Sequence, residues 1–324
     1  MKSTALFELG TLEVSSEAAE VLAGAEIDPE VYFDRHRCGD WGDVPDWLRG
    51  DNDRAAHSEL YSHAIRSHYL LSTETELLLV TATDRSRTRL QLAHEFRERE
   101  VAVQDGYAIW AASYENPNPL IAVEQPVVEG LLLALPCPGR AIDVGTGTGR
   151  LARMIARRGA RSVLGVDATE EMLSVARTLA LKEGLHSIRF ERTVIGEHPL
   201  PAADNTFDLL TSGLMLCHLP DLRAGVAECA RVLRPGGSMV LSDFHPATQA
   251  FGWRTDFITP DGRMLLPNVL CTRQDNIDAV TSAGCSVLEV KDIGLDGLPY
   301  GDVSEAAIKA KGLPPLCLVI WAQK

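Results

Sequence analysis

The chain has 324 residues, of which 45% are hydrophobic and 23% charged, a composition typical of globular proteins and not of fibrous or low-complexity ones. Asp and Glu number 45 against 31 Lys and Arg, and the formal net charge of −14 argues against nucleic acid and anionic membranes as partners. The longest apolar runs, at 77–83 and 130–137, fall far short of the ~20 residues of a membrane-spanning helix.

The start of the chain and the cysteines bear on compartment. Glu8 and Glu13 come before any apolar core, so we expect no secretory signal and a cytoplasmic protein. The seven cysteines contain no CxxC pair, which indicates reduced thiols, and no grouping with histidine has zinc-site spacing. We therefore expect no metal.

Residues 1–95 predict a small α+β domain. Helical patterns come first, at residues 16–23, 28–37 and 45–58. Strand patterns separated by polar turns follow, at residues 65–71, 76–82 and 88–92. This part matches no catalytic motif, and its role as a surface for homodimer formation, a lid or a protein-recruiting module is left open.

Residues 96–324 predict a second domain. After a linking segment at 96–103 and a helix that ends near residue 136, residues 140–244 alternate between short apolar strands and amphipathic helices. Such alternation favours a parallel sheet with helices on both faces. The expected fold class is α/β, a Rossmann-like, doubly wound and mostly parallel sheet.

A glycine-rich turn follows the first strand of this domain. In AIDVGTGTGRL, Gly145, Gly147 and Gly149 lie between an apolar strand and a helix, and glycine allows a ligand to approach the backbone closely. Asp167 ends the next strand, 22 residues after the first glycine, which suits a carboxylate that binds ribose hydroxyls. The turn therefore predicts a nucleoside site.

A dinucleotide is the competing ligand for such a turn. Arg150 stands where the dinucleotide fingerprint GxGxxG requires its third glycine. Asp143 adds a carboxylate at the strand tip, which would repel a pyrophosphate and attract an ammonium or sulfonium. Both features favour a cationic nucleoside.

The run around the turn resembles motif I of the class I S-adenosylmethionine-dependent methyltransferases, of the methyltransferase type 11 kind. Three later segments agree in order and spacing: LPAADNTFDLL, HLPDLRAGVAECARVLRPGG and SMVLSDF. The resemblance covers about residues 141–244. It implies two closing antiparallel strands, which the apolar runs at 286–296 and 313–324 would supply, and an accessory module before the methyltransferase domain.

The resemblance also implies a set of residues that bind S-adenosylmethionine: Asp143, Gly145, Thr146, Gly147, Gly149, Asp167, Ala168, Met172 and Glu197. Asp143 would lie near the methionine end and Asp167 at the ribose. Met172 would pack on adenine, although a Met on an amphipathic helix also commonly fills the core. Glu197 would contact adenine from a position about one residue away from the usual one.

Methyl transfer needs alignment of the acceptor and exclusion of water, and a general base helps when the acceptor must lose a proton. His245 directly follows the last strand of SMVLSDF, at the sheet edge where such folds bind ligands, and is the first candidate. Capping of a turn before Pro246 is its alternative role. His218, after the preceding strand, is the second candidate.

Two segments offer aromatic rings for the walls of an acceptor site: Tyr107, Trp110 and Tyr114 in the first, and Phe251 and Trp253 in the second. Aromatic walls favour a small apolar or aromatic acceptor, although such rings also pack in cores. We therefore expect a methyltransferase acting on a small organic molecule. The alternative is a sensor or scaffold that binds the same cofactor without turnover, and a dehydrogenase is a distant third.

Overall fold

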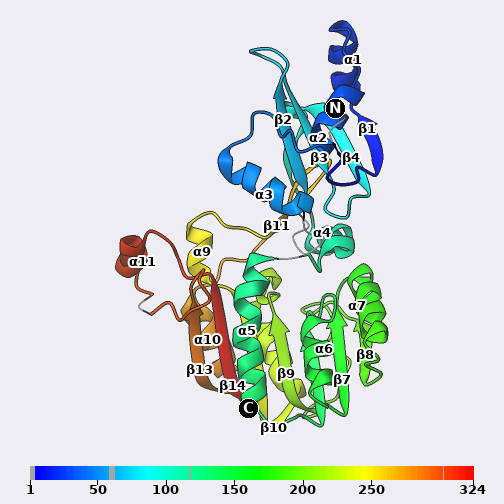
Figure 1. Cartoon of the computed structure of the whole chain (residues 1–324). Helices are drawn as coiled ribbons and strands as arrows, with labels where there is room; N and C mark the ends of the chain where they lie inside the picture. Colours follow the sequence, from blue (N-terminus) through cyan, green and yellow to red (C-terminus); the bar gives the residue numbers. More distant parts are fainter. Residues whose placement is uncertain (1–3, 58–62, 117, 302) are drawn as a thin grey trace. The chain divides into compact units, whose positions relative to one another are not determined.

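The computed structural model describes residues 4–57, 63–116, 118–301 and 303–324 (Figure 1). Within those ranges the chain forms two compact units. The first contains residues 4–101, 112–116 and 255–266, and the second contains residues 102–111, 118–254 and 267–324. The chain therefore enters and leaves the first unit several times.

The first unit holds most of the elements predicted for residues 1–95. Its helices are α1 (Ser16–Gly24), α2 (Glu30–Arg37) and α3 (Asp46–His57). Its main strands are β1 (Thr11–Val14), β2 (Ile65–Leu70), β3 (Glu76–Thr81) and β4 (Arg87–Leu92), in the order β1-β4-β3-β2. Ser15 caps α1 by accepting a hydrogen bond from the Ala18 N–H, as its residue type predicts. The short β1 was not predicted from sequence.

A second sheet of the first unit uses residues from the middle of the chain. It contains β5 (Arg97–Glu100), β11 (Asp256–Thr259) and β12 (Gly262–Leu265), in the order β11-β12-β5. Asp261, at the hairpin turn, forms an ion pair with Arg89 of β4 at 2.9 Å, and Gln91 donates to the Pro260 carbonyl at 2.8 Å. The sequence placed both 96–101 and 255–266 in the second domain, because short strands with distant partners carry little local signal.

The second unit is built on a seven-stranded sheet, and its α/β class is as predicted. The strands are β6 (Arg140–Val144), β7 (Ser162–Asp167), β8 (Ile188–Arg192), β9 (Phe207–Gly213), β10 (Leu233–Phe244), β13 (Ser286–Ile293) and β14 (Cys317–Gln323). Their order is β13-β14-β10-β9-β6-β7-β8. The two closing strands pair antiparallel with each other, and β14 is also antiparallel to β10, which confirms the expected mostly parallel sheet with an antiparallel C-terminal strand. β13 itself runs in the same direction as β10. A helical crossover leads from β10 to β13 and preserves the strand direction.

Helices cover both faces of this sheet. The helices of the unit are α4 (Val103–Trp110), α5 (Pro119–Ala134), α6 (Arg150–Arg157), α7 (Glu170–Lys182), α8 (Leu222–Val232), α9 (Pro246–Ala250), α10 (Arg273–Ser282) and α11 (Glu305–Lys311). Figure 1 shows α5 and α6 in front of the sheet, and α8 and α10 pack on the opposite face. Successive side chains of a strand point to opposite faces of the sheet, so one strand contributes to the core on each face. In β6, Ala141 packs on the side of α5 and α6, and Ile142 packs on the other side. No helix in the described part of the chain has the length and apolar character to cross a membrane.

Candidate functional site

The glycine turn connects β6 to α6 at the carboxyl edge of the sheet. Gly145, Gly147 and Gly149 have φ of 67°, 55° and 82°, a left-handed conformation that side chains other than glycine rarely adopt. A Cβ at Gly145 would lie 2.4 Å from Cγ of Met215. The turn therefore needs glycine both for its backbone path and for its lack of a side chain.

The turn is fastened to the end of β7. Thr146 N–H donates to the Val166 carbonyl at 2.9 Å, and Gly147 N–H donates to Oδ2 of Asp167 at 2.8 Å. The other oxygen, Oδ1, accepts from Thr169 N–H at 2.9 Å. Burial raises the pKa of Asp167, although its side chain keeps some exposure to solvent. A carboxylate oxygen accepts more than one bond, so Asp167 retains the chemistry expected for ribose hydroxyls.

Asp143 lies beneath the turn and is 1% exposed. Its carboxylate accepts bonds from the Thr146 hydroxyl at 2.6 Å, the Thr211 hydroxyl at 2.7 Å and the Ala152 N–H at 3.1 Å. Burial raises the pKa of Asp143 to about 6, despite these donors. Asp143 thus holds the turn against α6 and β9, and its contact with the methionine end of a cofactor stays a prediction.

The other residues expected at the cofactor lie around the ends of β7 and β8. Met172 is 1% exposed in α7, which agrees with a core position. Ala168 is partly exposed, and its carbonyl accepts a bond from Arg192. Glu197 is exposed in the segment between β8 and β9. The contacts of all three with adenosine stay predictions.

His245, the first candidate base, is buried directly after β10. Its Nδ1 accepts from the Ala247 N–H at 3.1 Å, so a neutral ring carries its proton on Nε2, which lies 3.1 Å from Oδ1 of Asp292. Burial alone would raise the pKa of Asp292, but hydrogen bonds from His245 and Arg273 outweigh it and lower that pKa. Both ring nitrogens are thus engaged by the chain, which is the geometry of the capping alternative; a role as base stays a prediction.

His218, the second candidate, lies in the one-turn helix η3 (Leu216–His218) after β9. Its Nδ1 is 2.9 Å from the Pro267 carbonyl, and its Nε2 is 2.9 Å from the Tyr107 hydroxyl. Burial lowers the pKa of His218, with a smaller opposing effect from the Pro267 carbonyl. The rings of Tyr107 and Trp110 are stacked with centroids 5.9 Å apart. The structure therefore brings Tyr107 together with two other predicted site residues, the candidate base His218 and the acceptor-wall residue Trp110.

The remaining aromatic candidates are not shown in this group. Tyr114 belongs to the first unit. Phe251 and Trp253 follow α9 in the second unit and are 47% and 39% exposed. Their place in an acceptor wall stays a prediction.

A buried ion pair beside the turn was not anticipated. Glu124 of α5 is fully buried, its Oε2 lies 2.8 Å from Nη1 of Arg150, and its Oε1 accepts from the Ser242 hydroxyl at 2.5 Å. Arg150 stands at the position where the dinucleotide fingerprint has its third glycine. In this structure that position therefore holds a charged side chain that forms an ion pair with Glu124. One signal was present in the sequence, because Glu124 interrupts the apolar face of α5.

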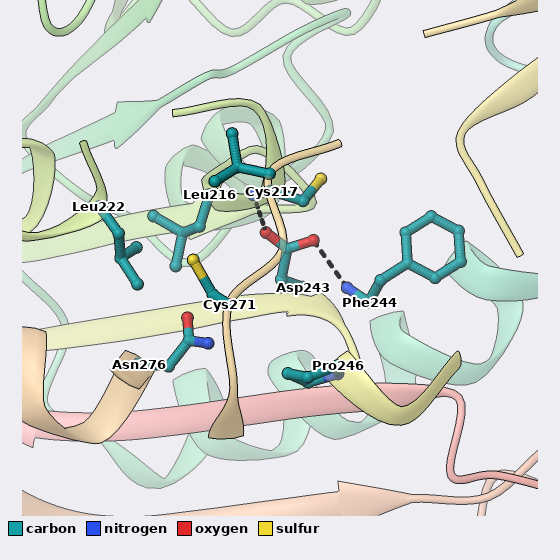
Figure 2. Close-up of a pocket in the computed structure, with 9 residues that line it drawn as sticks. Leu216, Cys217, Leu222, Asp243, Phe244, Pro246, Cys271 and Asn276 are labelled. Atoms are coloured by element: carbon teal, nitrogen blue, oxygen red, sulfur yellow. Dashed lines mark hydrogen bonds between the residues drawn. The ribbon is translucent and has the colours of Figure 1, made fainter. Parts of the chain in front are cut away.

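Asp243, at the end of β10, lines a small pocket that sequence reasoning also missed (Figure 2). Its oxygens accept from the backbone N–H groups of Cys217 at 2.6 Å and Phe244 at 2.7 Å, as the dashed lines in Figure 2 show. Burial raises the pKa of Asp243 to about 6. Cys271 and Asn276 also line the pocket. Among the described residues, no cluster of three or more His, Cys, Asp or Glu side chains could hold a metal ion.

The fold and the turn define a Rossmann-like α/β domain with a nucleoside-type glycine site. A family model described as a methyltransferase domain matches residues 142–241. The ubiquinone biosynthesis O-methyltransferase of Hahella chejuensis is 42% identical over 115 residues, which are 35% of this chain and 47% of that protein. The enzyme of the same name from Xylella fastidiosa is 30% identical over 169 residues, 50% of this chain and 65% of that protein. The chain thus spans about half to two thirds of the length of these curated relatives.

A solved complex from Haloferax volcanii, between the Trm112 methyltransferase activator and a methyltransferase, agrees in fold. The TM-score is 0.51 at 18% identity, and the match covers 68% of this chain and 96% of that one. Residues 142–241 of the second unit therefore match a methyltransferase domain, and the second unit shares the fold of this solved complex. β14 lies between β10 and β13 and pairs antiparallel with both.

Proposed function

We propose that this protein is an enzyme that transfers a methyl group from S-adenosylmethionine to a small organic acceptor. The observation that carries the proposal is the glycine turn, with three left-handed glycines and a backbone bond to Asp167. Gly145 packs directly against Met215 in a left-handed conformation that only glycine adopts readily, and Asp167 offers acceptor oxygens at the end of β7. These features fit an adenosine group bound over the sheet edge.

The residues that would hold the cofactor have separate tasks. Gly145, Thr146, Gly147 and Gly149 would form the floor, and Asp167, with Ala168 beside it, would bind the ribose. When bound, S-adenosylmethionine supplies an electrophilic methyl group on a sulfonium whose sulfur leaves as a neutral thioether. The chain then has to align the acceptor and exclude water. Asp143 would contribute by fixing the turn, and Met172 and Glu197 by contacting adenine.

An oxygen atom on a small acceptor is the methylated position that the comparisons support best. Two relatives that match about a third to a half of this chain are named O-methyltransferases. The stacked rings of Tyr107 and Trp110 offer an apolar wall on the second unit. Phe251 and Trp253, which also belong to the second unit, complete the proposed acceptor site. A cytoplasmic location and a homodimer through the first unit remain proposals from sequence.

The second candidate is a protein that binds the cofactor without turnover. One observation favours it: both ring nitrogens of His245 are engaged by the chain, which disfavours the first candidate base. Methyl release from labelled S-adenosylmethionine in the presence of a metabolite extract distinguishes the two functions. We expect labelled product from the extract, and binding without any product would favour the sensor.

Calorimetric titration tests the cofactor itself. S-adenosylhomocysteine should bind and NADH should not, because Arg150 stands where the dinucleotide fingerprint has its third glycine. Binding of NADH alone would overturn the proposal. Asp204 provides a control substitution because its side chain is exposed and is not among the residues proposed to bind the cofactor. The Asp204→Ala protein should bind S-adenosylhomocysteine as the wild type does.

A further inference from the structure

We propose that Tyr107 and His218 form a proton relay that accepts the proton of a hydroxyl acceptor. The inference rests on the proposed methyltransferase function and assigns the proton-accepting role to a pair of residues. Tyr107 lies on α4 and His218 on η3, 111 residues apart in sequence, and their polar atoms are 2.9 Å apart. Their rings meet edge to face, with centroids 5.4 Å apart and an interplanar angle of 84°.

The hydrogen-bond partners fix the direction of the relay. The Pro267 carbonyl can only accept, so Nδ1 of His218 carries a proton and donates to it. In the neutral ring Nε2 then has the lone pair and accepts from the Tyr107 hydroxyl. The chain therefore holds His218 in the tautomer in which the basic nitrogen faces the phenol.

A phenol in this position can pass on a proton. The acceptor hydroxyl gives its proton to the Tyr107 oxygen while the Tyr107 proton moves to Nε2 of His218. The acceptor oxygen forms its bond to the methyl carbon, and the electron pair of the broken carbon–sulfur bond stays on sulfur. The products are a methyl ether, a neutral thioether and the His218 imidazolium, so the single positive charge of the sulfonium is conserved. The Pro267 carbonyl remains bonded to the imidazolium at Nδ1.

The strength of the base limits the acceptor. Burial lowers the pKa of His218, and the groups that influence it include no charged side chain of the described residues. Such a base is mismatched with an aliphatic alcohol but suits a more acidic hydroxyl, such as a phenol, whose pKa is about 10 in tyrosine. The neighbouring stacked rings of Tyr107 and Trp110 suit an aromatic acceptor as well. We therefore place the acceptor among small phenols or enols.

Histidine-selective ¹⁵N NMR, with 4-nitrophenol as a probe, tests the relay. Without the probe, the His218 signal, assigned with the His218→Gln protein, should be that of a neutral ring protonated on Nδ1. With S-adenosylhomocysteine and 4-nitrophenol bound, at a pH where the free dye is protonated, the attraction between the two charges formed in the site should drive the transfer: His218 should become an imidazolium and the dye should absorb as phenolate. Both changes should be lost in Tyr107→Phe, which keeps the ring. The controls His186→Gln, at an exposed histidine, and Tyr300→Phe should leave both changes intact.

Four outcomes would overturn the relay. These are a ring protonated on Nε2, a His218 that stays neutral while the dye ionises, full proton transfer in Tyr107→Phe, and failure of the dye to bind protein that holds S-adenosylhomocysteine. Failure of the proposed function gives a different result, because then S-adenosylhomocysteine does not bind or labelled methyl is never released. Methyl release together with an unchanged His218 signal would reject the relay alone.

Discussion

The glycine turn after β6 lies at the same edge of the sheet as the segment after β9 that contains His218, which is called the rim below. The two are assembled differently. In the turn, Asp143 bonds to Thr146 three residues away, and Gly147 bonds to Asp167 20 residues away. At the rim, His218 takes its partners from 49 and 111 residues away. The turn is thus assembled mostly from one stretch of chain, with Thr211 as a more distant partner of Asp143, whereas the proposed acceptor side depends on segments from across the unit.

The largest effect is expected from the buried pair beside the turn, Glu124 and Arg150. Glu124→Gln removes the buried negative charge that pairs with Arg150, and loss of one member of a buried pair costs about 3 to 5 kcal/mol. The free energy of unfolding, measured in urea, should fall by that order. Glu129→Gln, an exposed position on the same helix, should change it by less than about 0.5 kcal/mol. Equal values for the two variants would show that the pair contributes nothing.

A pH-dependent effect should mark the interior beneath the turn. The pKa of Asp143 is about 6 in the folded protein and 3.8 in its ordinary state, so between these values the folded state binds more protons. The stability of the wild type relative to Asp143→Asn should therefore fall as pH rises from 4 to 7, by at most roughly 3 kcal/mol.

Asp208, near the start of β9, has a pKa that is shifted in the other direction, so it should change the pH dependence of stability with the opposite sign. Burial acts to raise the pKa of Asp208, but hydrogen bonds from the Arg140 N–H and the Arg234 side chain outweigh it, and the pKa is lowered. The stability of the wild type relative to Asp208→Asn should thus be lost as pH falls through the lowered pKa. The free energies of unfolding of the wild type, Asp143→Asn and Asp208→Asn, measured in urea at several pH values, check both signs. The same sign for both variants would contradict the prediction.

Cofactor affinity should respond to the turn and not to the rim. Asp167→Ala removes the carboxylate that binds Gly147 and the proposed ribose, at a cost of about 1 to 3 kcal/mol, or about 5- to 150-fold in the Kd for S-adenosylhomocysteine. His218→Gln should leave that Kd within about threefold, since its partners are on the acceptor side. Unchanged affinity in Asp167→Ala would remove the ribose assignment.

The smallest effect separates the two histidines. His245→Gln should lower the free energy of unfolding by about 1 to 2 kcal/mol, because the bonds to Ala247 and Asp292 are lost, while methyl transfer per folded molecule stays within a few-fold. Thermal unfolding and turnover measured on the same samples check this. A loss of turnover that far exceeds the loss of folded protein would restore His245 as the base.

The sequence predicted the elements whose signals are local. The spacing of Gly145, Gly147 and Gly149, the apolar strand before them and Asp167 after the next strand indicated the α/β class and a nucleoside turn. Strand and helix periods also located most elements of both units. These features depend on backbone conformation and neighbouring residues, so a single stretch of chain contains the information.

Tertiary structure decided what distant segments share. The burial of Glu124 with Arg150, the capture of β11 and β12 by the first unit, and the pairing of His218 with Tyr107 each need residues that are far apart in sequence. The sequence ranked His245 above His218, because His245 directly follows its strand, although both lie at the same edge of the sheet. Only the fold showed that Ala247 and Asp292 take both nitrogens of the first ring, whereas the second ring presents its basic nitrogen to a phenol, because hydrogen-bond partners are fixed by packing and not by spacing.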